Sequence, residues 1–560
     1  MASNRPLIRH PMVGWYDPGQ LLRTGIEVAI STIFGRHADA RLMESLSVVK
    51  TPKFHDLSEA ATPDFWFDFV SDTGDGFDPT YAVARAIATD ACRTHPETEP
   101  PQLLVFGGDQ VYPAPTREAY QQRLEDVYRA AFADSTQRPK VFAIPGNHDW
   151  YDSLVAFRRL FCTGREFAGC PTEQVRSYFA LKLPQRVWLF AFDIQLSSDI
   201  DGPQLSYFDK LCCEDLQPED RVILLVPEPF WIYRTMYPDD AGYSESNLDE
   251  LKRRIEKSGA RVLAFLAGDL HHYMRFTAID GLSQLITAGG GGAFLHPTHG
   301  MRAPRFLSDH AQTSKYVATE ESGELKPDCA FPSTRASFWL TFQNLKFPLI
   351  NPRFALAMGL FYACLTLAYV DNSLADLLTF WAKFNAIFLG EIEPLSVFAT
   401  LFVVGLFVLV TDTHRSSYRI LGGGVHATAH IVAALLLYAA SEQLLQILHF
   451  DSLRNFGWGH LLWHFGVLGI SGALVGPLLL GAYLLVSLNV LGRHSGEAFS
   501  SLKIPDYKNF LRFKIAADGS ITLYAFGIRR VPRRWSEHST PKGLDKAASG
   551  VHLIELKHLA

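Results

Sequence analysis

The chain has few cysteines and no excess of positive charge. Only seven of its 560 residues are cysteine, and these show no repeated pair of cysteines separated by two residues, as a common zinc module would need. Their odd number and the adjacent pair Cys212 and Cys213 do not suit a disulfide framework. Lysine and arginine number 52 against 58 aspartates and glutamates, a net charge of −6. We therefore expect reduced thiols and no nucleic-acid partner.

The beginning of the chain also lacks a long apolar run. Residues 1–15 contain polar residues and two prolines instead of a secretory signal, so we expect the N-terminal half to stay in the cytosol. Residues 19–35 have the periodicity of an amphipathic helix, within an N-terminal segment of residues 1–60. Its apolar face could pack on the protein itself, on a partner or on a membrane surface.

Residues 61–345 alternate between short apolar stretches and stretches of helical periodicity. This alternation predicts a layered α/β domain whose loops at the strand ends carry the chemistry. The expected strands are Phe65–Asp72, Leu103–Asp109, Lys140–Pro145, Tyr178–Leu196 as a hairpin, Arg221–Val226, Arg261–Ala267 and Gln284–Ala288. The expected helices are Thr80–Cys92, Arg117–Ala133, Pro203–Cys213 and Glu245–Lys257.

Four apolar segments without Asp, Glu, Lys or Arg follow, and each approaches or exceeds the ~20 residues that span a bilayer. They are Phe354–Val370, Leu395–Val410, Ile420–Ala440 and Leu461–Leu491. We expect an all-α transmembrane region of about four helices at residues 346–491. The basic residues between the second and third segments and at both flanks predict an integral membrane protein with cytoplasmic N- and C-termini. Residues 492–560 then form a small cytosolic tail, in which residues 519–531 predict a hairpin.

Four of the expected strands lead into polar motifs, which read SDTGDG, GGDQVY, PGNHDW and AGDLHHY. In chain order they bring Asp, Asp, Asn-His and Asp-x-His to one edge of a sheet, where oxygen ligands and imidazoles can converge on two cations. Each motif alone is weak, because Gly-Asp after a strand is often only a turn. The residues concerned are Asp72, Asp109, Tyr112, Asn147, His148, Asp269, His271 and His272.

This ordered set resembles the calcineurin-like metallophosphoesterases. The Asp-x-Gly and Gly-Asp-x-x-Tyr spacings are similar to the purple acid phosphatase variant, and AGDLHHYMR, GGAFLHPTH and EAFSSLKIPDYKNFLRF resemble a membrane-bound group of these proteins. The resemblance covers roughly residues 60–300 and extends loosely to about 515. It implies a β-sandwich flanked by helices. It also implies a phosphohydrolase in which a hydroxide between two metal ions attacks a phosphomonoester, phosphodiester or pyrophosphate.

The resemblance also implies a role for each motif residue. One metal ion would be held by Asp72, Asp109, Tyr112 and His271, and the second would share Asp109 and add Asn147 and Asp269. His148 would hydrogen-bond or protonate the leaving oxygen, or it would only brace its loop. The glycine-rich residues 288–299 could approach a ligand or lie beneath the site, and the candidate substrate-binding residues are His272, His296 and His299.

Two positions depart from the family pattern. Asp269 stands where a histidine is usual, and a carboxylate favours iron, manganese or magnesium over zinc. Pro227 stands where a lone histidine ligand is expected, so Glu228, water or substrate would have to replace it. The sequence predicts a membrane-anchored phosphohydrolase for a small-molecule or lipid phosphate. The alternative is a catalytically impaired sensor or binding module coupled to the membrane region.

Two pairs of histidines lie four residues apart in the apolar segments. These are His426 with His430 and His460 with His464, and on a helix each pair shares one face. Two facing pairs could bind a haem, a metal or a polar ligand, and the membrane half would then be a transporter or cofactor carrier regulated by the soluble domain. The alternative is that each histidine hydrogen-bonds a neighbouring carbonyl.

Overall fold

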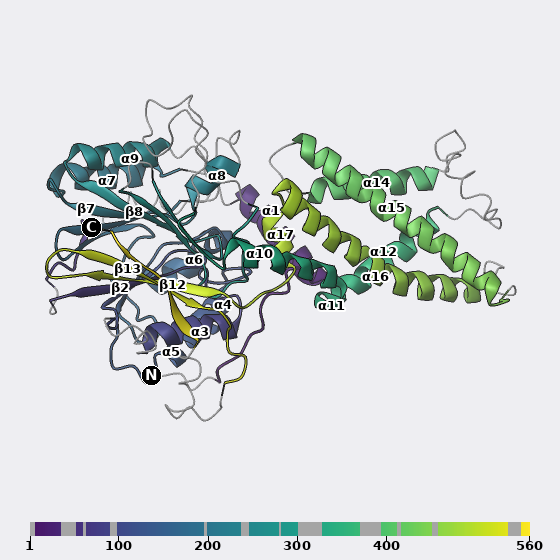
Figure 1. Cartoon of the computed structure of the whole chain (residues 1–560), viewed down its shortest axis with the longest axis horizontal. Coiled ribbons are helices and arrows are strands. Elements are labelled where there is room, and N and C mark those ends of the chain that lie inside the picture. The colour runs from purple at the N-terminus through teal and green to yellow at the C-terminus, as the bar shows by residue number, and fades with distance from the viewer. Residues whose placement is uncertain are drawn as a thin grey trace. The chain divides into compact units, whose positions relative to one another are not determined.

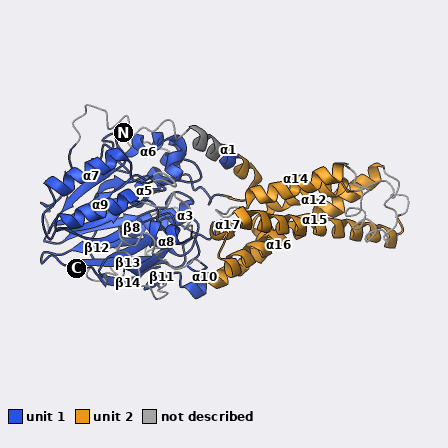
Figure 2. Ribbon diagram, turned by 90° about the horizontal axis from the view of Figure 1, so that it is seen from above, with its two compact units in different colours: residues 1–13, 23–337, 503–560 blue, residues 14–22, 338–502 orange. Residues whose placement is uncertain are grey.

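The computed structural model describes most of the chain. The chain folds into two compact units. The described residues are 6–34, 52–59, 63–89, 98–194, 199–236, 246–278, 282–300, 327–369, 394–411, 416–450, 457–535 and 550–559. Unit 1 consists of residues 1–13, 23–337 and 503–560, and unit 2 of residues 14–22 and 338–502 (Figure 2). The end points of five expected elements lie outside the described residues: Gly35, Cys92, Leu196, Glu245 and Val370.

Unit 1 is a sandwich of two sheets (Figure 1). The six-stranded sheet has the order β14-β13-β12-β2-β3-β4, and the eight-stranded sheet has the order β1-β5-β6-β7-β8-β10-β9-β11. In chain order these strands are β1 His55–Asp56, β2 Phe65–Val70, β3 Leu103–Phe106, β4 Lys140–Ala143, β5 Phe179–Leu183, β6 Val187–Ala191, β7 Arg221–Leu225, β8 Arg261–Ala267, β9 Tyr273–Thr277, β10 Gln284–Ala288, β11 Cys329–Phe331, β12 Lys508–Ile515, β13 Ile521–Ile528 and β14 Val551–His558.

Alternating side chains of these strands build three apolar layers. Phe67, Leu189 and Ile223 belong to the cluster between the two sheets. On the outer face of the six-stranded sheet lie α3 Phe77–Ala88, α5 Asp126–Ala131 and α6 Val155–Phe161. On the outer face of the other sheet lie α7 Gly202–Glu214, α8 Phe230–Met236 and α9 Ser246–Lys257. The expected layered α/β architecture is therefore confirmed, and each expected strand region contains a strand.

The C-terminal region is part of this sandwich and not a separate tail. The expected hairpin at residues 519–531 is wrong, because β13 is one continuous strand whose partners are β12 and β14. β12 in turn pairs antiparallel with β2, with Leu511 opposite Phe69 and Ile515 opposite Phe65. Alternating apolar residues reveal that a strand has a buried face, but they do not reveal which distant strand lies beside it.

A buried ion pair joins the same two strands. Arg512 lies opposite Asp68 in the register, and its Nε and Nη2 donate to Asp68 Oδ1 and Oδ2, each at 2.7 Å. The side chains are 2% and 0% exposed. Breaking one partner of such a pair leaves an uncompensated buried charge, so residues from opposite ends of the chain depend on each other.

Unit 2 is helical. Its main helices are α12 Pro352–Leu367, α14 Pro394–Val410, α15 Ser416–Ile447 and α16 Trp458–Leu491. Of the described helices, α15 and α16 are long and apolar enough to cross a membrane, and the segment Thr334–Ile350 with α12 forms a third if that pair, bent by 67°, is one span. Helices occupy all four expected segments, but α14 is shorter than a full span, so four crossings remain a prediction.

Glycines let α12 and α16 pack closely. A Cβ on Gly359 would lie 2.1 Å from the Gly469 carbonyl oxygen, and a Cβ on Gly472 would lie 2.6 Å from Cβ of Tyr362. Small residues at such crossings are typical of membrane helices, where packing and polar contacts drive association. The expected amphipathic helix near the N-terminus is present as α1 Pro18–Phe34.

Candidate metal centre

Three aspartates at strand ends have a backbone conformation that L-residues rarely adopt. Asp72 follows β2, Asp109 follows β3 and Asp269 follows β8, with φ angles of 59°, 47° and 67°. Left-handed conformations cost energy for non-glycine residues and are concentrated at functional sites. Because β2 and β3 belong to one sheet and β8 to the other, these turns bring carboxylates from both sheets together.

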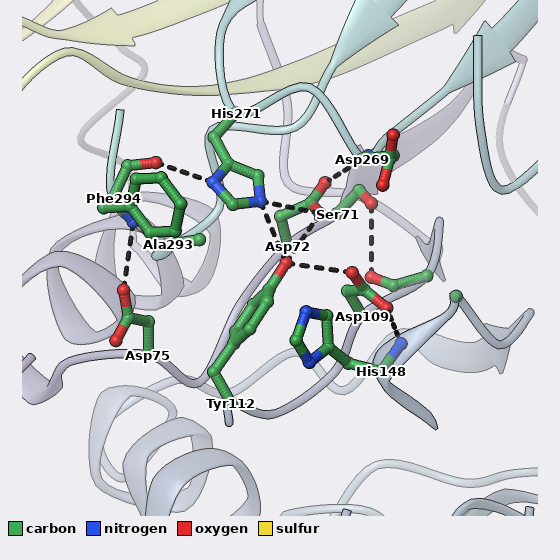
Figure 3. A network of polar contacts seen from close by, with 12 residues as sticks. Ser71, Asp72, Asp75, Asp109, Tyr112, His148, Asp269, His271, Ala293 and Phe294 are labelled. Carbon is green, nitrogen blue, oxygen red and sulfur yellow. Dashed lines mark hydrogen bonds and ion pairs between the residues drawn. The ribbon is translucent and has the colours of Figure 1, made fainter. Parts of the chain in front are cut away.

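The hydroxyl of Tyr112 lies at the centre of a buried cluster (Figure 3). It is 2.9 Å from Asp72 Oδ1, 3.1 Å from Asp109 Oδ2 and 3.0 Å from His271 Nε2. Neighbouring ligands of an octahedral ion with bonds of ~2.1 Å are separated by roughly 3 Å. Among the described residues no three His, Cys, Asp or Glu side chains alone form a metal-binding group. The distances between these oxygen and nitrogen atoms suit a metal ion only when the Tyr112 oxygen is counted as one of its ligands.

Backbone groups hold these side chains in place. His271 Nδ1 donates to the Phe294 carbonyl at 2.7 Å, so its Nε2 faces the cluster without a proton. The amide of Asp269 donates to Asp72 Oδ2 at 2.9 Å, and the amide of His148 donates to Asp109 Oδ1 at 2.8 Å. Such contacts orient donor atoms before a ligand arrives.

The cluster concentrates acidic groups away from water. Burial raises the pKa of Asp72 and of Asp269 to about 7 each. Burial, and then repulsion by neighbouring carboxylates, raises the pKa of Asp109 well above its usual range. Burial lowers the pKa of His271, so its ring stays neutral. Carboxylates in such a site require protons or cations to balance their charge.

A small pocket, with room for about one water molecule, opens beside the cluster. With its amide nitrogen toward Asp109, Asn147 donates to Oδ2 at 2.8 Å and to Oδ1 at 3.3 Å, and its oxygen then faces away from Asp109. The pocket is lined by Gly108, Asp109, Gly146, Asn147, Ile194, Pro227, Glu228 and Asp269. Pro227 and Glu228 therefore lie beside Asp109, Asn147 and Asp269, the expected ligands of a second metal.

Two residues that the sequence did not single out also reach the site. Tyr233 on α8 donates to the Asp269 carboxylate, which gives the unusual aspartate a partner. Lys508, at the start of β12, donates to the Ala293 carbonyl, and burial lowers its pKa to about 8 despite attraction by Asp75 and Asp72. Tyr233 falls outside every motif. Lys508 lies within the segment EAFSSLKIPDYKNFLRF, whose resemblance carried no expectation about the site.

The predicted histidines separate into two groups. His148 packs its ring 4.5 Å from that of Tyr112, and His296 stacks on His271 at 4.1 Å, so both lie at the cluster. His299 contacts Ser337 Oγ at 2.7 Å. His272 is fully buried, and neither ring nitrogen has a hydrogen-bond partner among the described residues. Its burial does not suit contact with substrate.

The glycine-rich loop lies beneath the cluster. A Cβ on Gly289 would come within 2.6 Å of Asp72 Oδ2, and a Cβ on Gly291 within 2.3 Å of the Ser71 carbonyl oxygen. The amides of Gly291 and Ala293 donate to the carbonyls of Ser71 and Asp72. These contacts favour the alternative in which the glycines support the Asp72 turn.

Residues 65–273 match the family model described as calcineurin-like phosphoesterase. The chain contains a calcineurin-like phosphoesterase domain. This match confirms the family indicated by the motifs and covers all the expected metal ligands. No curated protein matches the chain.

Several solved structures are similar to this chain at low identity. GAP50, the anchor in the inner membrane complex of Plasmodium, is 13% identical with a TM-score of 0.32, covering 44% of this chain and 76% of that one. Purple acid phosphatase PPD1 of yellow lupin (Lupinus luteus) is 14% identical with a TM-score of 0.31, covering 41% and 45%. The 5'-nucleotidase of Candida albicans is 15% identical with a TM-score of 0.24, covering 40% and 46%. The chain spans less than half of the last two proteins.

Proposed function

We propose that this protein is a metal-dependent phosphohydrolase that acts on a phosphomonoester, phosphodiester or pyrophosphate. The observation that carries the proposal is the Tyr112 hydroxyl, which lies within 3.1 Å of donor atoms of Asp72, Asp109 and His271 inside a calcineurin-like phosphoesterase domain. Four converging donors in a buried acidic site are more than packing requires.

The donors suggest where two metal ions bind. Asp72, Asp109, Tyr112 and His271 would hold one ion, while Asp109, Asn147 and Asp269 line the pocket that suits the other. Oxygen donors predominate, which favours iron, manganese or magnesium over zinc. Bound metal ions supply a Lewis acid for the phosphoryl oxygens and a water of lowered pKa.

His148 is positioned to act at the leaving group. Its Nδ1 donates to the Pro113 carbonyl at 2.9 Å, so Nε2 is the nitrogen that can accept a proton. Burial lowers the pKa of His148 to about 4, so the free protein holds it neutral. A phosphate bound nearby would attract a proton to Nε2, and that proton could pass to the leaving oxygen.

The test is metal-dependent phosphate release by the full-length protein in detergent. Its metal content is measured by mass spectrometry, and p-nitrophenyl phosphate and bis(p-nitrophenyl) phosphate serve as monoester and diester probes. We expect bound metal, hydrolysis of at least one probe, and loss of hydrolysis on chelation that added Mn²⁺ or Fe²⁺ reverses. A preparation that binds no metal and releases no phosphate would contradict the proposal.

The runner-up is a sensor whose phosphoesterase fold has lost turnover through Pro227. Pro227→His restores the usual ligand type beside Asn147 and Asp269. Loss of a residue that only orients a metal ligand already costs roughly 10–100-fold in metal affinity, so a direct ligand should contribute at least as much. We expect the variant to bind its second metal more tightly and to hydrolyse the probes faster than the parent. Pro227→Ala is the matched control, because it removes the ring without adding a donor. Turnover that appears only in Pro227→His would favour the sensor.

We propose that α15 and α16 anchor the protein in a bilayer with both termini in the cytoplasm. Because β12 pairs with β2, the chain before and after the helices enters one sheet, which must lie on one side of a membrane. The number of crossings is therefore even. Two crossings use α15 and α16 alone, and four include the bent pair and α14. A site tethered beside lipid suits a lipid-linked or other membrane-derived phosphate.

A further inference from the structure

The histidines of unit 2 are turned into the helix bundle. His430 Nδ1 contacts the Tyr362 hydroxyl at 2.8 Å, and its Nε2 contacts His426 Nε2 at 3.1 Å. His464 Nε2 contacts the Ala363 carbonyl at 2.9 Å. Because protein groups contact these nitrogens, the arrangement does not support the haem or metal site considered from the sequence. The outer surface of the same helices is apolar, and Ile470 on α16 is 77% exposed.

The segment Thr334–Ile350, which we call the entry segment because it leads into α12, also exposes apolar side chains. It consists of α10 Thr334–Leu340, a 3₁₀ helix at Thr341–Lys346 and α11 Phe347–Ile350. Its exposed large apolar residues are Phe338, Trp339, Phe342, Leu345 and Leu349. Four of the five recur at spacings of three or four residues and therefore share one side of the segment. Soluble proteins rarely expose apolar groups together in this way.

The buried side of the entry segment carries polar side chains. Ser337, Thr341 and Asn344 are each 0% exposed. Asn489, in the last turn of α16, donates to Thr341 Oγ1 at 3.1 Å, and the Ser501 hydroxyl donates to Asn344 Oδ1 at 2.8 Å. A helix on the surface of a soluble domain buries its apolar side instead. This reversed arrangement indicates that lipid surrounds the entry segment on its outer side.

The entry segment packs on α16 at the depth where that helix should leave the hydrocarbon. Near the other end of α16, His460 Nε2 contacts Glu442 Oε1 at 3.3 Å, and such ionisable groups are costly inside a bilayer. From His460, ~20 residues of helix, or about 30 Å, cross the hydrocarbon and reach Gly481. A Cβ on Gly481 would lie 2.1 Å from the Asn344 carbonyl oxygen. The entry segment therefore meets α16 at the opposite boundary.

The direction of the entry segment also suits a boundary. α12 packs along α16 (Figure 1), and the entry segment is bent by 67° from α12 at the break before Pro352. With α12 along the bilayer normal, this bend leaves the entry segment about 23° from the membrane plane. A helix with one apolar side that lies nearly parallel to the bilayer has the geometry of an interfacial helix.

The charged residues of the entry segment are all positive. It contains Arg335 and Lys346, both exposed, and no aspartate or glutamate. Aromatic and basic side chains are enriched where membrane proteins meet lipid headgroups, and anionic lipids attract such cations. In a symmetric dimer the same patch faces itself, so a second copy on this face would bring like charges together. A lipid surface therefore fits the face better than a second copy does.

We propose that the entry segment binds the surface of a bilayer that contains anionic lipids. Trp339 and Phe342 lie among the upper parts of the acyl chains, and Arg335 and Lys346 lie at the headgroups. The inference rests on the proposed membrane anchoring by α15 and α16, and it adds a contact that runs along the bilayer instead of through it. Four crossings would then use α12 without the entry segment.

The test measures the depth of single nitroxide labels on the full-length protein in vesicles of phosphatidylcholine and phosphatidylglycerol. Each label is attached to one introduced cysteine after the seven native cysteines are replaced by alanine. Electron paramagnetic resonance then compares its accessibility to oxygen, which concentrates in lipid, and to a water-soluble nickel chelate. Phe342→Cys and Leu349→Cys report on the entry segment. Ile470→Cys reports on the anchoring, and Val155→Cys, exposed on α6 of unit 1, is the control in water.

We expect both labels in the entry segment to lie roughly 5–10 Å into the boundary between headgroups and acyl chains. Their oxygen-to-nickel ratios should be several-fold above that of Val155→Cys and below that of Ile470→Cys. Ratios equal to that of Val155→Cys would place the segment in water. Ratios equal to that of Ile470→Cys would make it part of a crossing, and labels reached by neither reagent would show that protein covers it. Each of these three results overturns the proposal.

The label at Ile470 separates this proposal from the anchoring on which it rests. If that label lies in lipid while those at Phe342 and Leu349 lie in water, only the inference about the entry segment fails. If the label at Ile470 lies in water, the anchoring fails with it. Should the protein without native cysteines not fold, Trp339→Phe in the native background decides. Brominated lipids should quench the parent more than this variant, and equal quenching would overturn the proposal.

Discussion

A chain that ends at residue 502 should fail to form its phosphoesterase domain, although it retains all of residues 65–273. The truncation removes β12, β13 and β14, which are half of the six-stranded sheet. β2, which leads into the Asp72 turn, would lose its antiparallel partner along five residue pairs. An excised fragment of residues 61–345 has the same defect.

The free energy lost with the three strands explains why the truncated domain should not fold at all. Without Arg512 the buried Asp68 keeps an uncompensated charge, which costs about 3–5 kcal/mol. The Phe513 ring, stacked on Phe67 at 4.5 Å, is lost from the layer between the sheets as well. Domains are stable by only about 5–15 kcal/mol in total. These two losses alone are comparable with the stability of the domain.

Limited proteolysis and near-ultraviolet circular dichroism of the purified proteins measure this effect. We expect the truncated protein to be cleaved throughout residues 65–273 under conditions in which the full chain resists. Supplying residues 503–560 as a separate, co-expressed polypeptide is the control, and it should restore resistance at least in part. A truncated protein that unfolds cooperatively with the midpoint of the full chain would show that the C-terminal strands are dispensable.

Asp109→Asn should lower phosphate release by at least about 10²–10³-fold, the usual loss when one group that stabilises developing charge is removed. Asp109 is the carboxylate shared by both proposed metal positions, because it contacts Tyr112 and also lines the pocket with Asn147. An amide has nearly the same shape but carries no charge and cannot bridge two cations in the same way. We therefore expect the metal content of the variant to fall together with its activity.

Asp152→Asn is the matched control for this variant. Asp152 also has a raised pKa because it is buried, but it caps α6 by accepting from the amides of Val155 and Ala156. Its loss should leave metal content unchanged and affect stability by about 1 kcal/mol. Full metal content and full activity in Asp109→Asn would remove Asp109 from the centre and contradict the proposed function.

Much of the candidate centre was predictable because its residues are local. Asp72, Asp109 and Asp269 each follow a buried strand, and the parallel strands β2 and β3 bring the first two to one edge of a sheet, as expected. The expectation that Asp269 lies at the same sheet edge is wrong, because β8 belongs to the other sheet and meets the first two only where the sheets pack together. Tyr112 and His271 lie within three residues of these aspartates, so a short motif contains most of one proposed metal site. The role of His272 was not predictable in this way, because His271 and His272 are neighbours in the bend before β9 and the sequence does not show which of the two rings enters the cluster.

By itself, the sequence determined the phosphoesterase family, the strands that carry the motifs and the apolar helices, because these depend on residue types at short spacing. Only the tertiary structure decided that β12, β13 and β14 complete the six-stranded sheet and that Lys508 and Tyr233 reach the site. It alone also joined Tyr362 to His430 across two helices. Pairing between distant segments depends on shape and on partners that can be hundreds of residues away, and no local pattern of apolar and polar residues encodes that choice.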